Sequence, residues 1–235
     1  MNTTPSIFMP SPINAVLEGL YEANTTMAEL KRHGDFGIGT FNDLDGEMII
    51  VDGQIFQMDI DGCAHSVDND EKTPFAAVCK FKAISTDLID KPIDADKFND
   101  LLDKCLPSRN MMYAIRIEGL FSKVRTRAVQ KTANYTPLVE ATSAQKESVF
   151  ENVEGTLVGF YTPDFIPSVN VPGYHFHFIT ADRDKGGHVL ECGLNKGTIA
   201  IQFYTRLDLN LPVTLDYLSA DFNRNAAEDL EKAER

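Results

Sequence analysis

The stretch FGIGTFNDLDGEMIIVDGQIFQMDIDGCAHSV, residues 36–67, decides the fold. Short apolar runs alternate in it with three Asp-Gly pairs, at 45–46, 52–53 and 61–62. Asp-Gly between apolar runs is a strong signal for a tight hairpin turn, because both residues tolerate a positive φ. The stretch therefore predicts consecutive short antiparallel strands rather than a helix.

The same pattern extends in both directions from this stretch. On its N-terminal side, prolines predict an extended arm over residues 1–12, and apolar spacing predicts a helix over 13–21. A second short helix, capped by Thr25 or Thr26, is expected to run through Lys31 and to end at Gly34. On its C-terminal side we expect a helix over 94–106. Residues 112–130 are expected to hold two strands, joined near Glu118 and Gly119. Further strands are expected over 74–84, 154–163 and 197–211.

Strands outnumber helices and do not alternate with them, so a βαβ fold is excluded. The expected fold class is α+β, strand-rich, with mostly antiparallel or mixed sheets in two packed β-lobes and few helices. We expect a single catalytic domain over 1–235, with the lobes dividing between 130 and 154. The C-terminal residues 223–235 have helix-forming composition.

Composition limits the possible partners. The formal net charge of −13 argues against nucleic acid or an anionic membrane surface as the main partner. The N-terminus lacks the features of a secretory signal, and no stretch reaches about 18 uninterrupted apolar residues. The four cysteines are scattered and form no CxxC pair, which is typical of reduced thiols. We therefore expect a cytoplasmic protein.

Three of the five histidines lie in GYHFHFITADRDKGGHVLECG, residues 173–193. On an extended strand His175 and His177 project from one face. A hairpin that places His188 opposite Ile179 brings it to the same face, diagonally adjacent to His177. The geometry depends on this register, because a slip of one residue would turn His188 to the other face.

The spacing leaves more than one interpretation open. Three neutral imidazoles are enough for a catalytic zinc, which keeps its fourth position open. An HxH pair is also found on half-buried strands that bind no metal. A non-enzymatic structural zinc is a further possibility, and it would need a fourth protein ligand, for which Cys192 is the nearest candidate.

GYHFHFITADRDKGGHVLE resembles the metal-binding segment of the alpha-acetolactate decarboxylase family, including its HxH-x10-H spacing. The resemblance extends in the same order along nearly the whole chain, from about Gly19 to Glu234. The other matching stretches are HGDFGIGTFNDLDGEMIIVDG (33–53), TPFAAV with LPSRNMMYAIRIEGLFSKVRTRAV (within 73–129) and EGTLVGFYTPDF (154–165).

The resemblance implies a zinc enzyme of acetoin biosynthesis and the butanediol pathway. Such an enzyme converts 2-acetolactate (2-hydroxy-2-methyl-3-oxobutanoate) to acetoin and CO2. The implied zinc ligands are His175, His177 and His188.

Three further residues match the family's catalytic positions. Glu47 in LDGEM matches an active-site glutamate, and Arg127 matches the arginine that meets the substrate carboxylate. Glu234 matches a second glutamate from the C-terminal tail, with Glu228 and Glu231 close by. From spacing alone, Arg127 would be an exposed strand arginine, and Arg125 shares its strand face.

This chemistry agrees with the residue types. Loss of CO2 from a β-keto acid leaves an electron pair that moves onto the neighbouring carbonyl oxygen. Zinc held by neutral histidines keeps its full positive charge and can stabilise the negative charge on that oxygen. The expected partner is a small anionic hydroxy-keto acid, and the expected assembly is a homodimer. The alternative function is a related metal enzyme acting on another hydroxy-keto acid.

Overall fold

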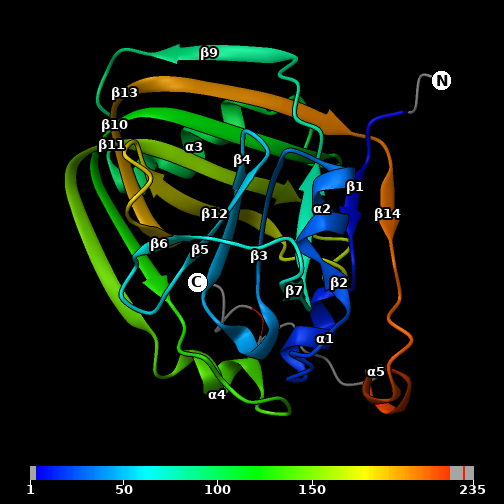
Figure 1. Cartoon of the computed structure of the whole chain (residues 1–235). Helices are drawn as coiled ribbons and strands as arrows, with labels where there is room; N and C mark the ends of the chain where they lie inside the picture. Colours follow the sequence, from blue (N-terminus) through cyan, green and yellow to red (C-terminus); the bar gives the residue numbers. More distant parts are fainter. Residues whose placement is uncertain (1–3, 223–229, 231–235) are drawn as a thin grey trace.

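The computed structural model describes residues 4–222 and 230, and its strands form two large sheets and one small pair (Figure 1). The strand order is β14-β1-β8-β3-β4-β5-β6 in the seven-stranded sheet and β10-β11-β12-β13-β9 in the five-stranded sheet, and β2 pairs with β7. The strands are β1 Ile7–Met9, β2 Thr25–Thr26, β3 Phe36–Thr40, β4 Glu47–Val51, β5 Gln54–Met58, β6 Ala64–Ser66, β7 Lys72–Thr73, β8 Ala76–Cys79, β9 Ser85–Ile89, β10 Met112–Ala128, β11 Lys146–Thr162, β12 Gly173–Thr180, β13 Gly186–Tyr204 and β14 Leu207–Leu209. The helices are α1 Ile13–Leu17, α2 Met27–His33, α3 Ala95–Cys105, α4 Leu138–Thr142 and α5 Leu215–Ser219, with a 3-10 turn η1 at Asn42–Leu44.

The Asp-Gly pairs shape the seven-stranded sheet. Asp52 and Gly53 connect β4 to β5 with φ values of 53° and 74°, which are the positive values of a type I′ hairpin turn. Asp61-Gly62 lies between β5 and β6. Asp45-Gly46 lies between η1 and β4 instead of forming a two-residue hairpin. The predicted run of short antiparallel strands is confirmed, and only the β1–β14 pair in this sheet is parallel.

The five-stranded sheet closes on itself. Strand β10 pairs antiparallel with both β11 and β13, and β12 joins β11 to β13, so these four strands form a ring. The expectation that 112–130 holds two strands is wrong, because β10 is one continuous strand through Gly119. A curved strand with partners on both sides needs no turn there, and Gly119 instead lies opposite Gly155 and Gly197 on its neighbours.

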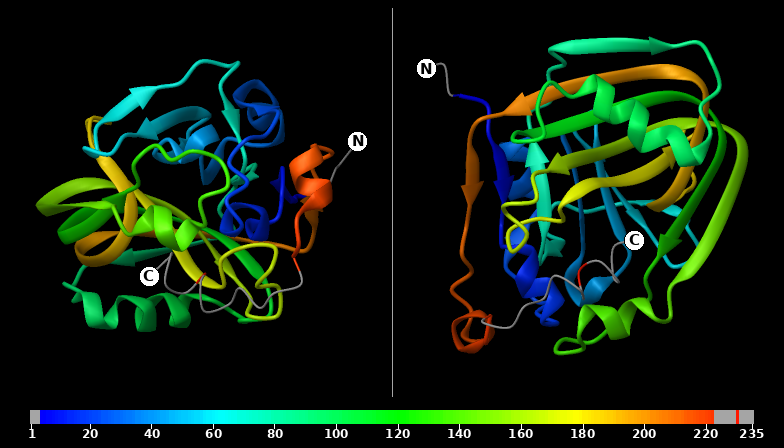
Figure 2. Two further views of the ribbon diagram at one scale, coloured as in Figure 1. Left: turned by 90° about the horizontal axis from the view of Figure 1, so that it is seen from below. Right: turned by 180° about the vertical axis from the view of Figure 1, so that it is seen from behind.

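The two sheets pack face to face around one apolar core. Side chains from β3 and β4, such as Ile38 and Ile49, meet side chains from β11 and β12, such as Val158 and Ile179. On the outer face of the five-stranded sheet, α3 covers a second core (Figure 2). On the outer face of the seven-stranded sheet, α2 packs over β8. The expected strand-rich α+β class with two packed β-layers is therefore confirmed.

The helix boundaries follow the local signals. Thr26 caps α2, its hydroxyl oxygen accepting a hydrogen bond from the amide of Glu29, and Gly34 ends the helix as expected. Helix α3 begins after Asp94, as predicted. Among residues 4–222 and 230, no helix combines the length and apolar character needed to cross a membrane.

Two details concern how the chain divides. Part of the expected N-terminal arm is β1, a buried strand between β14 and β8. Strand β10, which ends at Ala128, pairs with β11, which begins at Lys146, and the division into two lobes between 130 and 154 stays a prediction. The single catalytic domain over 1–235 stays a prediction.

Candidate metal and active site

The candidate site lies between the two sheets. Strands β12 and β13 contribute the histidines from the five-stranded sheet, and β4 faces them from the other sheet. His175 and His177 lie on the face that carries Ile179 toward the shared core, whereas Phe176 and Phe178 pack on the opposite side near α3. The strand period of two therefore places both histidines inside the sandwich, as predicted.

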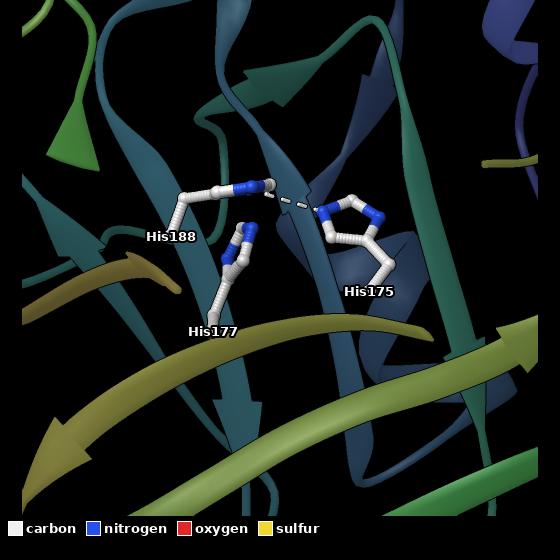
Figure 3. A group of neighbouring side chains, drawn as sticks. All are labelled: His175, His177 and His188. Carbon is white, nitrogen blue, oxygen red and sulfur yellow. Dashed lines mark hydrogen bonds between the residues drawn. The ribbon is translucent and has the colours of Figure 1, made fainter. Parts of the chain in front are cut away.

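The three histidines converge on one point (Figure 3). One ring nitrogen from each of His175, His177 and His188 lies within 4.8 Å of the others, and all three residues are buried. His175 Nε2 and His188 Nδ1 lie 3.2 Å apart. The prediction that His188 shares a face with the other two is confirmed.

The predicted hairpin register was wrong by two residues. His188 lies directly opposite His177, and Ile179 lies opposite Gly186. The loop between β12 and β13 is closed by Thr180 and Lys185, whose backbones are hydrogen-bonded to each other. A shift of two residues preserves the face, because side chains on a strand alternate with a period of two. The histidines consequently approach more closely than the diagonal arrangement would allow.

The backbone of β4 fixes the orientation of His177. Its Nδ1 lies 2.8 Å from the carbonyl oxygen of Met48, so Nδ1 carries the proton and donates it to that oxygen. The other nitrogen, Nε2, then presents its lone pair toward His175 and His188. No sequence pattern pointed to Met48, because a backbone carbonyl can act from any residue type.

Burial keeps the histidines neutral. Desolvation, reinforced by the charge of Arg127, lowers the pKa of His175 to about 3. Desolvation also lowers the pKa of His177 well below its ordinary value, and its neighbour His175 contributes in the same direction. A neutral imidazole is the form that binds a metal ion. The contact between His177 and Glu47 is therefore not a salt bridge.

Glu47 stands at the first position of β4, facing the histidines. One carboxylate oxygen accepts a hydrogen bond from the Arg127 guanidinium at 3.1 Å, and the other lies 3.5 Å from His177 Nε2. Gly46 makes this placement possible: its φ is +82°, and a Cβ there would meet the carbonyl oxygen of Met58 at 2.2 Å. Glu47 is buried, with only 6% of the residue exposed.

Arg127 reaches the site from β10, directly opposite His188 on β13. Its side chain is only 4% exposed. Arg125 instead lies at the surface, where it pairs with Glu147 and Glu191. Both arginines belong to β10, but Arg127 is buried beside Glu47, whereas Arg125 remains accessible beside its two ion-pair partners.

These residues line a cavity of about 40 Å3. Its polar wall holds Glu47, Arg127 and the three histidines, and its apolar wall comes from α1, α4 and the loops around β3. Thr40 also lines it, with its hydroxyl donating to the carbonyl of Gly46. A cavity of this volume has room for a few water molecules. A larger cavity of about 590 Å3 lies beside β9, and none of the five site residues lines it.

The three histidines fit a metal ion. Within residues 4–222 and 230, His177 Nε2 is buried and has no hydrogen-bond partner, although it faces two other imidazoles. Two nitrogens that share a tetrahedral zinc lie about 3.4 Å apart, close to the 3.2 Å between His175 and His188. Leaving a buried lone pair unsatisfied costs about 1–3 kcal/mol, which a metal bond would remove.

The remaining predicted residue, Glu234, lies outside the described residues, together with Glu228 and Glu231. Cys192 is buried but belongs to the core near α3, on the other side of the sheet from the histidines. It is therefore not placed to act as a fourth ligand. The structure thus brings together five of the six predicted site residues.

The class of protein follows from the fold and the site: a two-sheet α+β protein with a buried three-histidine group that can hold a metal ion, beside an arginine–glutamate pair. Sequence comparison then specifies the family. A profile of the alpha-acetolactate decarboxylase family matches residues 7–224.

Relatives match this chain over most of their own length. The alpha-acetolactate decarboxylase of Methanosarcina mazei is 43% identical over 235 residues, which are 100% of this chain and 82% of that protein. The Bacillus subtilis enzyme is 41% identical over 230 residues, 97% of this chain and 90% of that protein. The crystal structure of the B. subtilis strain 168 enzyme superposes with a TM-score of 0.94 at 40% identity, covering 97% of this chain and 99% of that one.

The chain therefore belongs to the alpha-acetolactate decarboxylase family. The resemblance noted in the sequence is confirmed, and with it the expectation of a decarboxylase, a carbon–carbon lyase.

Proposed function

We propose that this protein converts 2-acetolactate to acetoin and CO2 at a zinc site formed by His175, His177 and His188. The observation that carries the proposal is the convergence of three buried imidazoles beside Arg127 and Glu47 in a protein of this family. The site is a small cavity lined by these buried side chains.

The histidines hold the metal through ring nitrogens that burial keeps unprotonated. When bound, zinc supplies positive charge that stabilises the negative charge developing on the substrate oxygens as CO2 leaves. The Met48 carbonyl holds the His177 ring in the tautomer that this arrangement requires.

Arg127 binds the carboxylate that departs as CO2. Its planar guanidinium can hold a carboxylate through two parallel hydrogen bonds, which orients the bond that breaks. A buried position strengthens this contact, because water does not screen it. Glu47 accepts from the same guanidinium and so fixes the arginine at the cavity wall.

A glutamate then delivers a proton to one face of the resulting enediolate, which sets the handedness of the acetoin. Glu47 is placed for this step, since its carboxylate lies between Arg127 and His177. Glu234 is the second candidate, carried by the family resemblance. The alternative substrate is another hydroxy-keto acid, because Arg127 would recognise any carboxylate of suitable size.

Metal analysis of the purified protein, combined with an acetoin assay on acetolactate, tests the proposal. We expect stoichiometric zinc, loss of acetoin formation after chelation, and recovery when zinc is restored. His177→Ala should lose both metal and activity. His65→Ala is the matched control, because His65 lies at the surface beside Asp59 and should keep both. Full turnover by metal-free protein would refute the zinc mechanism.

Two further comparisons resolve the roles. Glu47→Gln and Glu234→Gln should differ: the variant that removes the proton donor is expected to lose about 100-fold or more in kcat and the handedness of the product. Side-by-side turnover of acetolactate and 2-aceto-2-hydroxybutyrate tests the substrate. A clear preference for the second substrate would favour the alternative.

A further inference from the structure

The cavity of the candidate site has a polar wall and an apolar wall. Glu47, Arg127 and the three histidines form the polar wall. Helices α1 and α4, which pack against each other at one end of the sandwich (Figure 1), contribute apolar side chains to the other wall. These side chains are Ile13, Val16 and Leu138, all of them buried, and we call them the α1–α4 cap.

Helical spacing directs two side chains of α1 to the cavity. Ile13 and Val16 are three positions apart, so they share one face of the helix. Leu17 follows directly on Val16 and is also buried, but it packs into the core without lining the cavity. Two neighbouring residues of one helix therefore differ in whether they contact the site.

Backbone hydrogen bonds hold the cap in place at both ends of α1. At its start, the amide of Ile13 donates to the carbonyl of Val169 at 3.0 Å. Just after its end, the carbonyl of Gly19 accepts from the amide of Tyr135 at 2.7 Å, and Tyr135 lies on the segment that leads into α4. The backbone therefore sets the position of the cap, and its side chains set the room inside the cavity.

The substrate of the proposed reaction divides in the same way as the cavity. In 2-acetolactate, C2 carries a carboxylate, a hydroxyl and a methyl group, and a second methyl group ends the acetyl group. The oxygen atoms require the polar wall, where Arg127 and the histidines lie, because burying an oxygen without a polar partner is costly. The alkyl groups are left for the apolar wall, where their burial is favourable.

Close packing makes the apolar wall sensitive to the length of an alkyl group. The cavity measures about 40 Å3, so its walls lie close together. Protein interiors are packed as densely as organic crystals, and an added methylene forces side chains away from their preferred positions. One methylene in an apolar pocket commonly changes kcat/KM by about 10-fold to 200-fold.

We propose, on the basis of the function proposed above, that the α1–α4 cap sets the length of the alkyl group accepted at C2, with Val16 and Leu138 as specificity-determining residues. The cap admits the methyl group of 2-acetolactate and discriminates against the ethyl group of 2-aceto-2-hydroxybutyrate. The charged and imidazole side chains of the site come from β4, β10, β12 and β13. The cap therefore selects the alkyl group from elements other than those that hold the oxygens.

The ratio of kcat/KM for the two substrates tests the cap. Wild type should prefer 2-acetolactate by about 10-fold or more. Val16→Ala and Leu138→Ala each make room at the apolar wall, and each should raise the relative kcat/KM for 2-aceto-2-hydroxybutyrate by about 5-fold or more. Both substrates are measured on one preparation, so the ratio does not depend on how much of a variant is folded. An unchanged ratio in one variant would overturn the role of that residue, and an unchanged ratio in both would overturn the proposal.

A larger side chain and a neighbouring position provide the matched variants. Val16→Ile adds one methylene to the apolar wall and should lower kcat/KM for 2-aceto-2-hydroxybutyrate more than for 2-acetolactate. Leu17→Ala is the control, because Leu17 is buried on the same helix but does not line the cavity. It should lower stability and leave the ratio within about 2-fold of wild type. A change in ratio as large as that of Val16→Ala would show that any loosening of α1 alters specificity, and would overturn the assignment to Val16.

The binding of unreactive acids separates this inference from the proposed reaction. 2-Hydroxy-2-methylpropanoate and 2-hydroxy-2-methylbutanoate keep the carboxylate and the hydroxyl, lack the acetyl group that decarboxylation needs, and differ from each other by one methylene. In calorimetry, wild type should bind the larger acid about 10-fold more weakly, and Val16→Ala should reduce this difference to about 3-fold or less. Equal affinities in wild type would overturn the cap even if acetoin is formed. A retained difference in affinity without acetoin formation would support the cap and refute the proposed reaction.

Discussion

The buried histidines make stability depend on pH, and His175 allows the size of the effect to be worked out. In the unfolded chain a histidine has a pKa of 6.5, whereas His175 in the folded chain has a pKa of about 3. Below pH 6.5 the unfolded state therefore binds a proton that the folded state does not. Since the unfolded state binds more protons, the free energy of unfolding falls as the pH falls from 6.5 toward 3.

The expected magnitude at pH 5 is about 2 kcal/mol for His175 alone, from 1.5 pH units at about 1.36 kcal/mol each. His177 also lowers the free energy of unfolding as the pH falls, because its pKa in the folded chain is lowered too. The cause is desolvation, which disfavours the charged imidazolium in a site where Arg127 already carries a positive charge.

Urea unfolding of metal-stripped protein at pH 7.5 and pH 5 measures this effect. Wild type should lose stability on acidification, and His175→Gln should lose about 2 kcal/mol less, because it has no proton to gain on unfolding. Val158→Ala is the control: it truncates a buried side chain opposite His177 and should lower stability equally at both pH values. If His175→Gln loses as much as wild type between the two pH values, His175 is protonated in the folded state and the reasoning fails.

Three further predictions concern the residues around the site and a helix cap. Arg127→Met should destabilise the fold by about 3–5 kcal/mol, because it removes the buried partner of Glu47. In urea unfolding, the double variant with Glu47→Met should lose less stability than the two single variants lose together. Additive losses would refute the coupling between the two residues. Gly46→Ala should lower both the melting temperature and kcat, because a Cβ at φ +82° meets the Met58 carbonyl and displaces Glu47. An unchanged kcat would show that the turn at Gly46 does not position the Glu47 carboxylate. Thr26→Ala should cost about 1 kcal/mol in urea unfolding and leave kcat unchanged, since it removes only the cap of α2.

Much of the fold was predictable because its signals are local. The Asp52-Gly53 turn, strand alternation and the cap at Thr26 act over a few residues, and the structure bears them out, whereas Asp45-Gly46 does not form the expected hairpin. The division of 112–130 into two strands failed for a non-local reason. Strand β10 stays continuous because β11 and β13 pair along its length on both sides, and no local pattern reveals those partners.

The candidate site was likewise predictable only where its signals are local. Alternation with a period of two placed His175 and His177 on one face, and it kept His188 on that face even though the register differed by two residues. The difference between Arg125 and Arg127 was not visible in the alternation, because the burial of Arg127 beside Glu47 depends on how the two sheets pack. The Met48 carbonyl was equally invisible, since every residue type carries one.

The sequence by itself determined the strand-rich class, the Asp52-Gly53 turn and the family, and it indicated which side chains form the candidate site. These depend on residue type and on short-range spacing, which the chain carries along its length. Only the tertiary structure decided that Glu47 and Arg127, from different sheets, meet at the histidines and are buried there. Burial and approach depend on how the sheets pack, and desolvation in that packed interior is what keeps the imidazoles neutral and able to bind a metal.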